Sequence, residues 1–166
     1  MEPIGKDFIE LLVKAEHSIR IADHMVYITY PLIKEHQLLK KVLDELCTIS
    51  MNIVQAILSY EYLNKRIQIH QDPKLNWDSF RQKSSVRFGL TNQEYEIIKE
   101  LLELAKKHKE SSMEFIRNEK IVIMSNNLRT DSVSVDQLKK YLSNLKVILQ
   151  KTKAKMVEDR ASMMRK

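Results

Sequence analysis

Three side chains that could take part in acid–base chemistry lie close together near the start of the chain, in the stretch AEHSIRIADHMVYITYPLIKEH (residues 15–36). On a helix, His17, Arg20 and His24 fall within about 60° of one another, and Glu10 precedes the two histidines on the same line. A histidine can move protons of a hydroxyl or leaving oxygen, and an arginine can stabilise phosphate charge. These residue types on one helical face are those that a metal-independent ribonuclease uses, so an RNA or nucleotide site is one interpretation of them.

The segment RIADH, from Arg20 to His24, resembles the Arg…His motif of the HEPN superfamily, which consists of small helical bundles that often act as dimers on RNA or nucleotides. The resemblance implies His24 as general acid or base, Arg20 on phosphate and His17 assisting. The family places more residues between arginine and histidine than the three found here, and RIQIH (residues 66–70) has the same short spacing. In addition, ADHMVYITYPLIKE together with KIVIMSNNLRTDSVSVDQL is similar to a family of uncharacterised archaeal proteins.

Two other interpretations of the same stripe stay open. A histidine between apolar neighbours is most often a partly buried residue satisfied by an acid or a carbonyl, and Arg20 can pair with Glu16 or Asp23. A metal site is the other alternative, but the seven-residue spacing of Glu10, His17 and His24 separates successive ligands by about 10.5 Å along the helix. We therefore predict no metal ligand and no cofactor.

Positive charge concentrates at the C-terminal end of the chain. The net charge is +6, and residues 139–166 hold nine Lys or Arg against two acids. Such a segment can attract RNA, and basic residues also alternate with aromatic ones between Trp77 and Phe88. The predicted nucleic-acid-binding residues are Lys151, Lys153, Lys155, Arg160, Arg81 and Arg87. The alternatives are a solvated helix end and a connecting segment whose aromatic rings close the end of the bundle.

The composition predicts a mainly α fold in a single domain, residues 1–150. Only two glycines and three prolines occur in 166 residues, which suits long helices. Apolar periodicity predicts helices over residues 7–30, 32–66 and 92–108, with a break or kink near Tyr30 caused by Pro31. The second helix is long enough either to kink around residues 48–52 or to project toward a partner.

Local sequence signals define the last third of the chain. Thr91 with Glu94 and Ser134 with Gln137 form capping boxes that begin two helices, and the alternating residues between them predict a small β hairpin at about 119–135. Periodicity fades after Gln150, so residues 151–166 are expected to form a basic, flexible tail. The expected fold is a bundle of four principal helices with a hairpin before the last one.

The remaining features bear on location and partners. The single cysteine, Cys47, fits a reducing cytoplasm, and no apolar run approaches the length of a membrane span. The first helix is apolar nearly all round in its second half, which predicts a homodimer through the first two helices. We expect a non-catalytic interaction or regulatory module, associated with RNA, and the alternative is a HEPN-like metal-independent ribonuclease.

Overall fold

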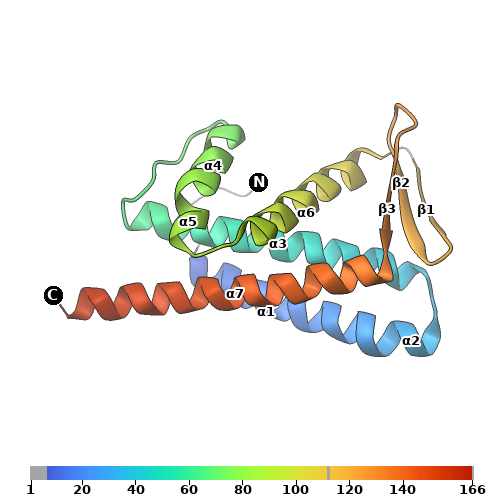
Figure 1. Ribbon diagram of the computed structural model, residues 1–166, viewed down its shortest axis with the longest axis horizontal. Helices are drawn as coiled ribbons and strands as arrows, with labels where there is room; N and C mark the ends of the chain where they lie inside the picture. The colour runs from blue at the N-terminus through green and yellow to red at the C-terminus, as the bar shows by residue number, and fades with distance from the viewer. Residues whose placement is uncertain (1–6, 112, 166) are drawn as a thin grey trace.

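The computed structural model describes residues 7–111 and 113–165, and it confirms a mainly α fold (Figure 1). Two of the helical segments, Met25–Thr29 (η1) and Phe80–Ser84 (η2), are single π-helical turns. The elements in chain order are α1 (Phe8–His24), η1 (Met25–Thr29), α2 (Tyr30–Ile33), α3 (Gln37–Leu63), α4 (Pro73–Ser79), η2 (Phe80–Ser84), α5 (Ser85–Arg87), α6 (Asn92–Glu110), β1 (Met113–Arg117), β2 (Lys120–Met124), β3 (Thr130–Ser134) and α7 (Val135–Met164).

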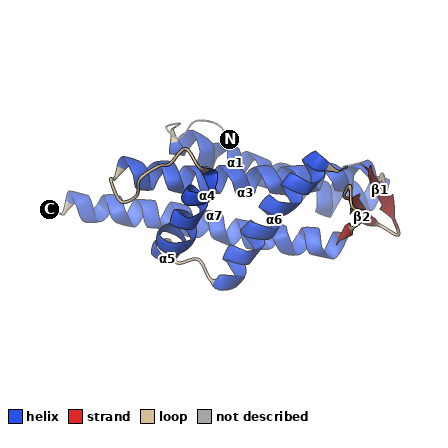
Figure 2. Cartoon of the chain, turned by 90° about the horizontal axis from the view of Figure 1, so that it is seen from above, coloured by secondary structure: helices blue, strands red, loops and turns tan. Residues whose placement is uncertain are grey.

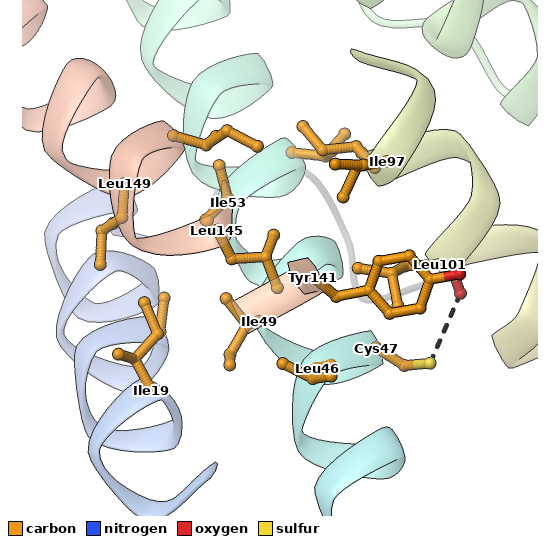
Figure 3. Packing of buried hydrophobic residues seen from close by; sticks show 14 of the residues in the cluster. Ile19, Leu46, Cys47, Ile49, Ile53, Ile97, Leu101, Tyr141, Leu145 and Leu149 are labelled. Atoms are coloured by element: carbon orange, nitrogen blue, oxygen red, sulfur yellow. Dashed lines mark hydrogen bonds between the residues drawn. The ribbon is translucent and has the colours of Figure 1, made fainter. Parts of the chain in front are cut away.

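Helix α3 forms the centre of the bundle, with α1, α6 and α7 packed around it (Figure 3). Its spine residues Leu46, Ile49 and Ile53 are fully buried. Helix α3 is an unbroken α-helix that begins at Gln37, so the predicted second helix is shorter at both ends than expected and has no kink at residues 48–52. In the described part of the chain it alone is long and apolar enough to cross a membrane, but 67% of its most apolar window is buried, as in a core helix.

The predicted break near Tyr30 lies a few residues later in the structure. The amide of Tyr30 donates to the carbonyl of Met25, five residues back, which makes η1 a π-turn. Thr29 and Tyr30 both have helical backbone angles, so Pro31 lies within a continuous helix, where its missing amide proton removes one helical hydrogen bond. The chain reverses at Lys34, whose φ is 56°.

A three-stranded antiparallel sheet, in the order β1–β2–β3, stands at one end of the bundle (Figure 2). The predicted hairpin corresponds to β2 and β3, and the sequence reading missed β1. Asn118 and Glu119 connect β1 to β2 with positive φ angles of 53° and 59°, as a tight hairpin turn requires. The sheet turns Ile121, Ile123 and Val133 inward, because alternate residues of a strand face the same side.

Both capping boxes are present and begin α6 and α7 as predicted. The expected loss of structure after Gln150 is wrong, because α7 continues as one helix to Met164. Met156 and Asp159 lie buried in this part of α7. Apolar periodicity did not predict this part of the helix because one of its inward-facing residues, Asp159, is charged.

Candidate functional site

The His17, Arg20 and His24 side chains are all exposed, so they do not form a seam inside the bundle. The buried side of α1 consists of Leu11, Leu12, Ala15, Ser18, Ile19 and Ala22. The Nδ1 atom of His24 lies 3.1 Å from the Thr29 hydroxyl. Within the described part of the chain, neither His17 nor Arg20 has a hydrogen-bond or ion-pair partner. The interpretation of these residues as partly buried and satisfied is therefore wrong.

Arg20 lies at the edge of an open groove between α1 and α7, which we call the α1–α7 groove. The groove has a volume of about 730 Å³. The apolar residues that line it are Ile19 from α1 and Leu149, Ala154 and Val157 from α7. Ile19 and Leu149 are also part of the bundle core (Figure 3), so the groove reaches down to the packed interior.

Two ion pairs hold α7 against α1 along this groove. Lys153 pairs with Glu16, and Lys146 pairs with Asp23. Each of these side chains is 39–44% exposed, so each pair stabilises the fold by only about 0–1 kcal/mol. Both acids that were candidate partners of Arg20 are thus engaged by lysines of α7, and the guanidinium of Arg20 remains available at the groove.

The solvent-facing side of α7 carries a row of exposed residues, which we call the outer stripe. It consists of Val147, Gln150, Ala154, Val157, Ala161 and Met164, all exposed. Val157 is 69% exposed and Met164 is 78% exposed. Since these residues alternate three and four positions apart, they lie along one side of the helix.

The predicted nucleic-acid-binding residues of the C-terminal segment are not a patch of free cations. Lys151 pairs with the buried Glu94 and donates to the carbonyl of Gly89 at 3.2 Å. Lys155 lies 3.5 Å from Glu158 and 3.9 Å from Asp159. Lys153 pairs with Glu16, so of these four residues only the exposed Arg160 has no ion-pair partner among the described residues.

The two predicted arginines of residues 77–88 have different surroundings. Arg81 is exposed, with its guanidinium 4.0 Å from Asp78. The neighbouring aromatic rings are packed inside the molecule, because Trp77 stacks on Phe80 and on Tyr95 with ring centroids 5.2 and 5.5 Å apart. These rings close one end of the bundle. The structure therefore favours the interpretation of this segment as a connection between helices over that of a nucleic-acid surface.

Arg87 belongs to a buried charge network that the sequence reading missed. Its guanidinium donates to both carboxylate oxygens of Glu61 from Nε at 3.0 Å and to Asp159 from Nη1 at 3.1 Å and Nη2 at 2.7 Å. Arg66 donates to Glu61 at 3.2 Å, and the Tyr60 hydroxyl donates to Asp159 at 3.0 Å. The assignment of Arg87 to a nucleic-acid surface is not supported, since its donors are directed at two acids of its own chain.

The electrostatics of this network follow from those contacts. Hydrogen bonds from Arg87 hold the pKa of Asp159 below its usual value, against the opposing effect of burial. Burial and the hydrogen bond to Asp159 raise the pKa of the Tyr60 phenol. The network joins α3, α5 and α7. Its two carboxylates face two guanidinium groups, so the charges balance and none of these groups is free for chemistry.

A second missed cluster joins the sheet to the helices. The imidazole of His108, at the end of α6, has Nε2 3.0 Å from a carboxylate oxygen of Asp44 and contacts Glu114 of β1 through Nδ1. In the part of the chain that the structure describes, no group of three or more His, Cys, Asp or Glu is arranged to hold a metal ion. Besides the α1–α7 groove, an open pocket of about 900 Å³ with mostly polar lining residues lies between the end of α6 and the loop from β2 to β3.

Comparison with known proteins yields no relative. No protein-family model matches the chain, and no curated protein and no solved structure is significantly similar to it.

Proposed function

We propose that this chain is a non-catalytic protein-interaction module that binds an amphipathic helix on its α1–α7 face, meaning the α1–α7 groove together with the outer stripe. The observation that carries this proposal is the exposure of Val157, Ala154 and Met164 beside a groove that reaches the core. An exposed apolar surface flanked by charges is a common feature of protein-binding sites.

The dimensions and lining of the groove suit a helix. It lies between two antiparallel helices, and its apolar floor is bordered by charges of both signs, from Glu16, Arg20, Lys146, Lys153 and Glu158. Helix-in-groove recognition uses apolar anchors on one face of the incoming helix and polar contacts at the rim. A mixed rim favours a protein partner over a polyanion, which needs positive charge of one sign.

Association with RNA is the competing interpretation. It draws on the basic composition of the C-terminal segment, but the acids paired with Lys151, Lys153 and Lys155 reduce the charge that these residues offer to a phosphate chain. Binding dominated by phosphate contacts weakens steeply with salt. Salt dependence therefore separates the two interpretations.

The test compares two labelled probes by fluorescence anisotropy. One is a model amphipathic helix with two leucines per heptad among lysine and glutamate, and the other is a mixed-sequence single-stranded RNA. Val157→Glu is expected to weaken binding of the peptide by about tenfold or more, which corresponds to about 1.4 kcal/mol. Val86→Glu is the matched control, since Val86 is 72% exposed on α5, away from the α1–α7 face.

The expected result is peptide binding that changes little with salt and is lost selectively in Val157→Glu. RNA binding that falls steeply with salt, is equal in both variants and is accompanied by no binding of the peptide would overturn the proposal in favour of an RNA-associated module.

The ribonuclease alternative has its own test. His24 and Arg20 are accessible on the same helix, but the imidazole of His24 lies against the Thr29 hydroxyl, its one side-chain partner among the described residues. Cleavage of a mixed RNA is measured without divalent metal for the wild type, His24→Ala and Arg20→Ala. We expect no cleavage above the background of a mock purification. Metal-independent cleavage that both substitutions abolish would replace the interaction module by a nuclease.

A further inference from the structure

Helix α7 has an inward row and an outward row of residues, and both rows recur every three or four positions. The inward residues Leu138, Leu142, Leu145, Leu149 and Met156 pack against the bundle. The outer stripe, Val147 to Met164, follows a repeat of three and four residues over nearly three heptads. A repeat of this kind is the seam of a coiled coil, in which apolar residues at two positions of each heptad meet a second helix.

Among residues 7–111 and 113–165, no segment covers the outer stripe. The C-terminal turns of α7 extend past the other helices in both views (Figures 1 and 2), and Val157, Met163 and Met164 are 69%, 52% and 78% exposed there. Helix α1 adds Ile9 and Val13 to the same surface, at 57% and 55% exposure. By contrast, the exposed stripe of α3 is mostly polar, with Lys41, Asp44 and Thr48 preceding the exposed Met51.

From these observations, and resting on the proposed function, we infer that the helix bound by the α1–α7 face is α7 of a second copy of this chain. The two α7 helices run antiparallel about a twofold axis that passes between residues 155 and 156. This dimer differs from the one predicted from the sequence, which used the first two helices, because α7 replaces α3 in the interface.

The antiparallel register pairs a large side chain with an alanine in two of its three distinct contacts. Val147 meets the partner's Met164, Gln150 meets the partner's Ala161, and Ala154 meets the partner's Val157. Each contact then occurs twice, as a closed twofold interface requires. Large-against-small layers of this kind interdigitate without leaving voids.

The charges beside the seam favour the antiparallel direction. Residues flanking a coiled-coil seam set partner choice and orientation. In the antiparallel pair, Glu158 approaches the partner's Lys151, which also pairs with Glu94 of its own chain, and Arg160 approaches the partner's Lys153, whose charge is balanced by Glu16. A parallel pair would oppose Lys146 to the partner's Lys151 and Arg160 to the partner's Arg165, two like-charge contacts against the one opposite-charge contact of Lys153 with the partner's Glu158.

The first measurement is sedimentation velocity of the full chain, without peptide, from about 1 to 100 µM, because association shifts with concentration by mass action. The wild type and Val86→Glu are expected to sediment as dimers at the upper end, and Val157→Glu as a monomer with an unchanged far-ultraviolet circular dichroism spectrum. A monomeric wild type, or a Val157→Glu dimer as tight as the control, would overturn the inference.

The second measurement tests the direction of the helices by disulfide formation. An equal mixture of Val147→Cys and Met164→Cys chains is expected to give a cross-linked dimer on mild oxidation, and each variant alone is expected to stay uncross-linked. Cross-linking of Val147→Cys with itself would show a parallel pair and overturn the register.

The outcomes also separate this inference from the proposed function. A chain that is monomeric yet binds the model peptide through Val157 removes the second copy and keeps the interaction module. A chain that neither dimerises nor binds the peptide removes both.

Discussion

Two residues of α7, only two positions apart, reverse the usual distribution of polarity. Asp159 is charged and 8% exposed, whereas Val157 is apolar and 69% exposed. The inner side of this segment buries a carboxylate among Arg87, Tyr60 and Arg66, and the outer side presents an aliphatic row to water. Neighbouring residues of one helix thus occupy the environments that each would ordinarily avoid.

The difference shows that burial depends on available partners as well as on polarity. A buried charge is tolerated when other charges and hydrogen bonds satisfy it, and the structure supplies those partners within the chain. An exposed apolar row is stabilised only when something covers it, and no described segment does so. The charged groups on the inner side find their partners within one chain, whereas the apolar residues on the outer side need a second molecule to cover them.

The largest effect on stability is expected from removing Arg87, the central cation of the inner side. Arg87→Ala leaves Glu61 and Asp159 buried without their main partner, and we expect it to lower the free energy of unfolding by about 3–5 kcal/mol. Urea denaturation at one protein concentration measures the change. Arg81→Ala, which removes an exposed arginine only 4.0 Å from Asp78, is the control and should change stability by less than about 0.5 kcal/mol. Equal effects of the two substitutions would show that the network contributes nothing.

A change of pH weakens the same network in part. Because Arg87 lowers the pKa of Asp159 in the folded chain, the ionised carboxylate stabilises the fold above its unfolded pKa of about 3.9. This contribution is lost as the pH falls through the lower folded value. We expect the wild type to lose more stability than Asp159→Asn between pH 5 and the acid limit, as followed by urea denaturation at each pH. Parallel curves for the two proteins would contradict the assignment.

A second ionic contact on the inner side predicts a smaller loss. Lys151 is the cation beside Glu94, whose side chain is 7% exposed and also accepts from the Thr91 hydroxyl. Since Thr91 stays in place, Lys151→Ala should cost about 1–3 kcal/mol. Lys139→Ala, at a partly exposed position of the same helix with a cation–π contact to Tyr27, provides a comparison that should cost less. The proposal of a buried contact fails if Lys139→Ala costs as much.

The outer side should respond least of all when the chain is monomeric. Val157→Ala removes two methyl groups that already face water, so at low concentration we expect a change in unfolding free energy of less than about 0.5 kcal/mol. At concentrations where the chain associates, the same substitution should weaken the dimer. A large effect at low concentration would mean that Val157 is covered within a single chain.

Helix starts were the part of the fold that local sequence predicts best. Thr91 with Glu94 and Ser134 with Gln137 satisfy backbone groups only three residues away, so their chemistry is readable without the rest of the molecule. The strand β1 was missed because its inward side is built by pairing with β2, where Ile116 lies opposite the buried Ile121. Pairing of this kind depends on contacts that a single segment does not show.

The candidate site illustrates the same limit. Helical periodicity placed His17, Arg20 and His24 on one side of α1, but it did not reveal that this side faces solvent, since Ile9 and Val13 share it. The partners of Arg87 come from residues 61 and 159, which are far away in the chain. The outer stripe could have been recognised, because its heptad spacing is visible in the sequence, but the more apolar inward row of the same helix obscured it.

The lone thiol of Cys47 has a consequence for measuring motion. Its Sγ–H donates to the carbonyl of Leu101 at 3.4 Å (Figure 3), and burial raises its pKa to about 12. In the closed bundle the thiol is both covered and protonated, so a reagent such as DTNB should modify it only when α3 and α6 separate. The rate of that reaction therefore reports how often the centre of the bundle opens, without any label having to be introduced.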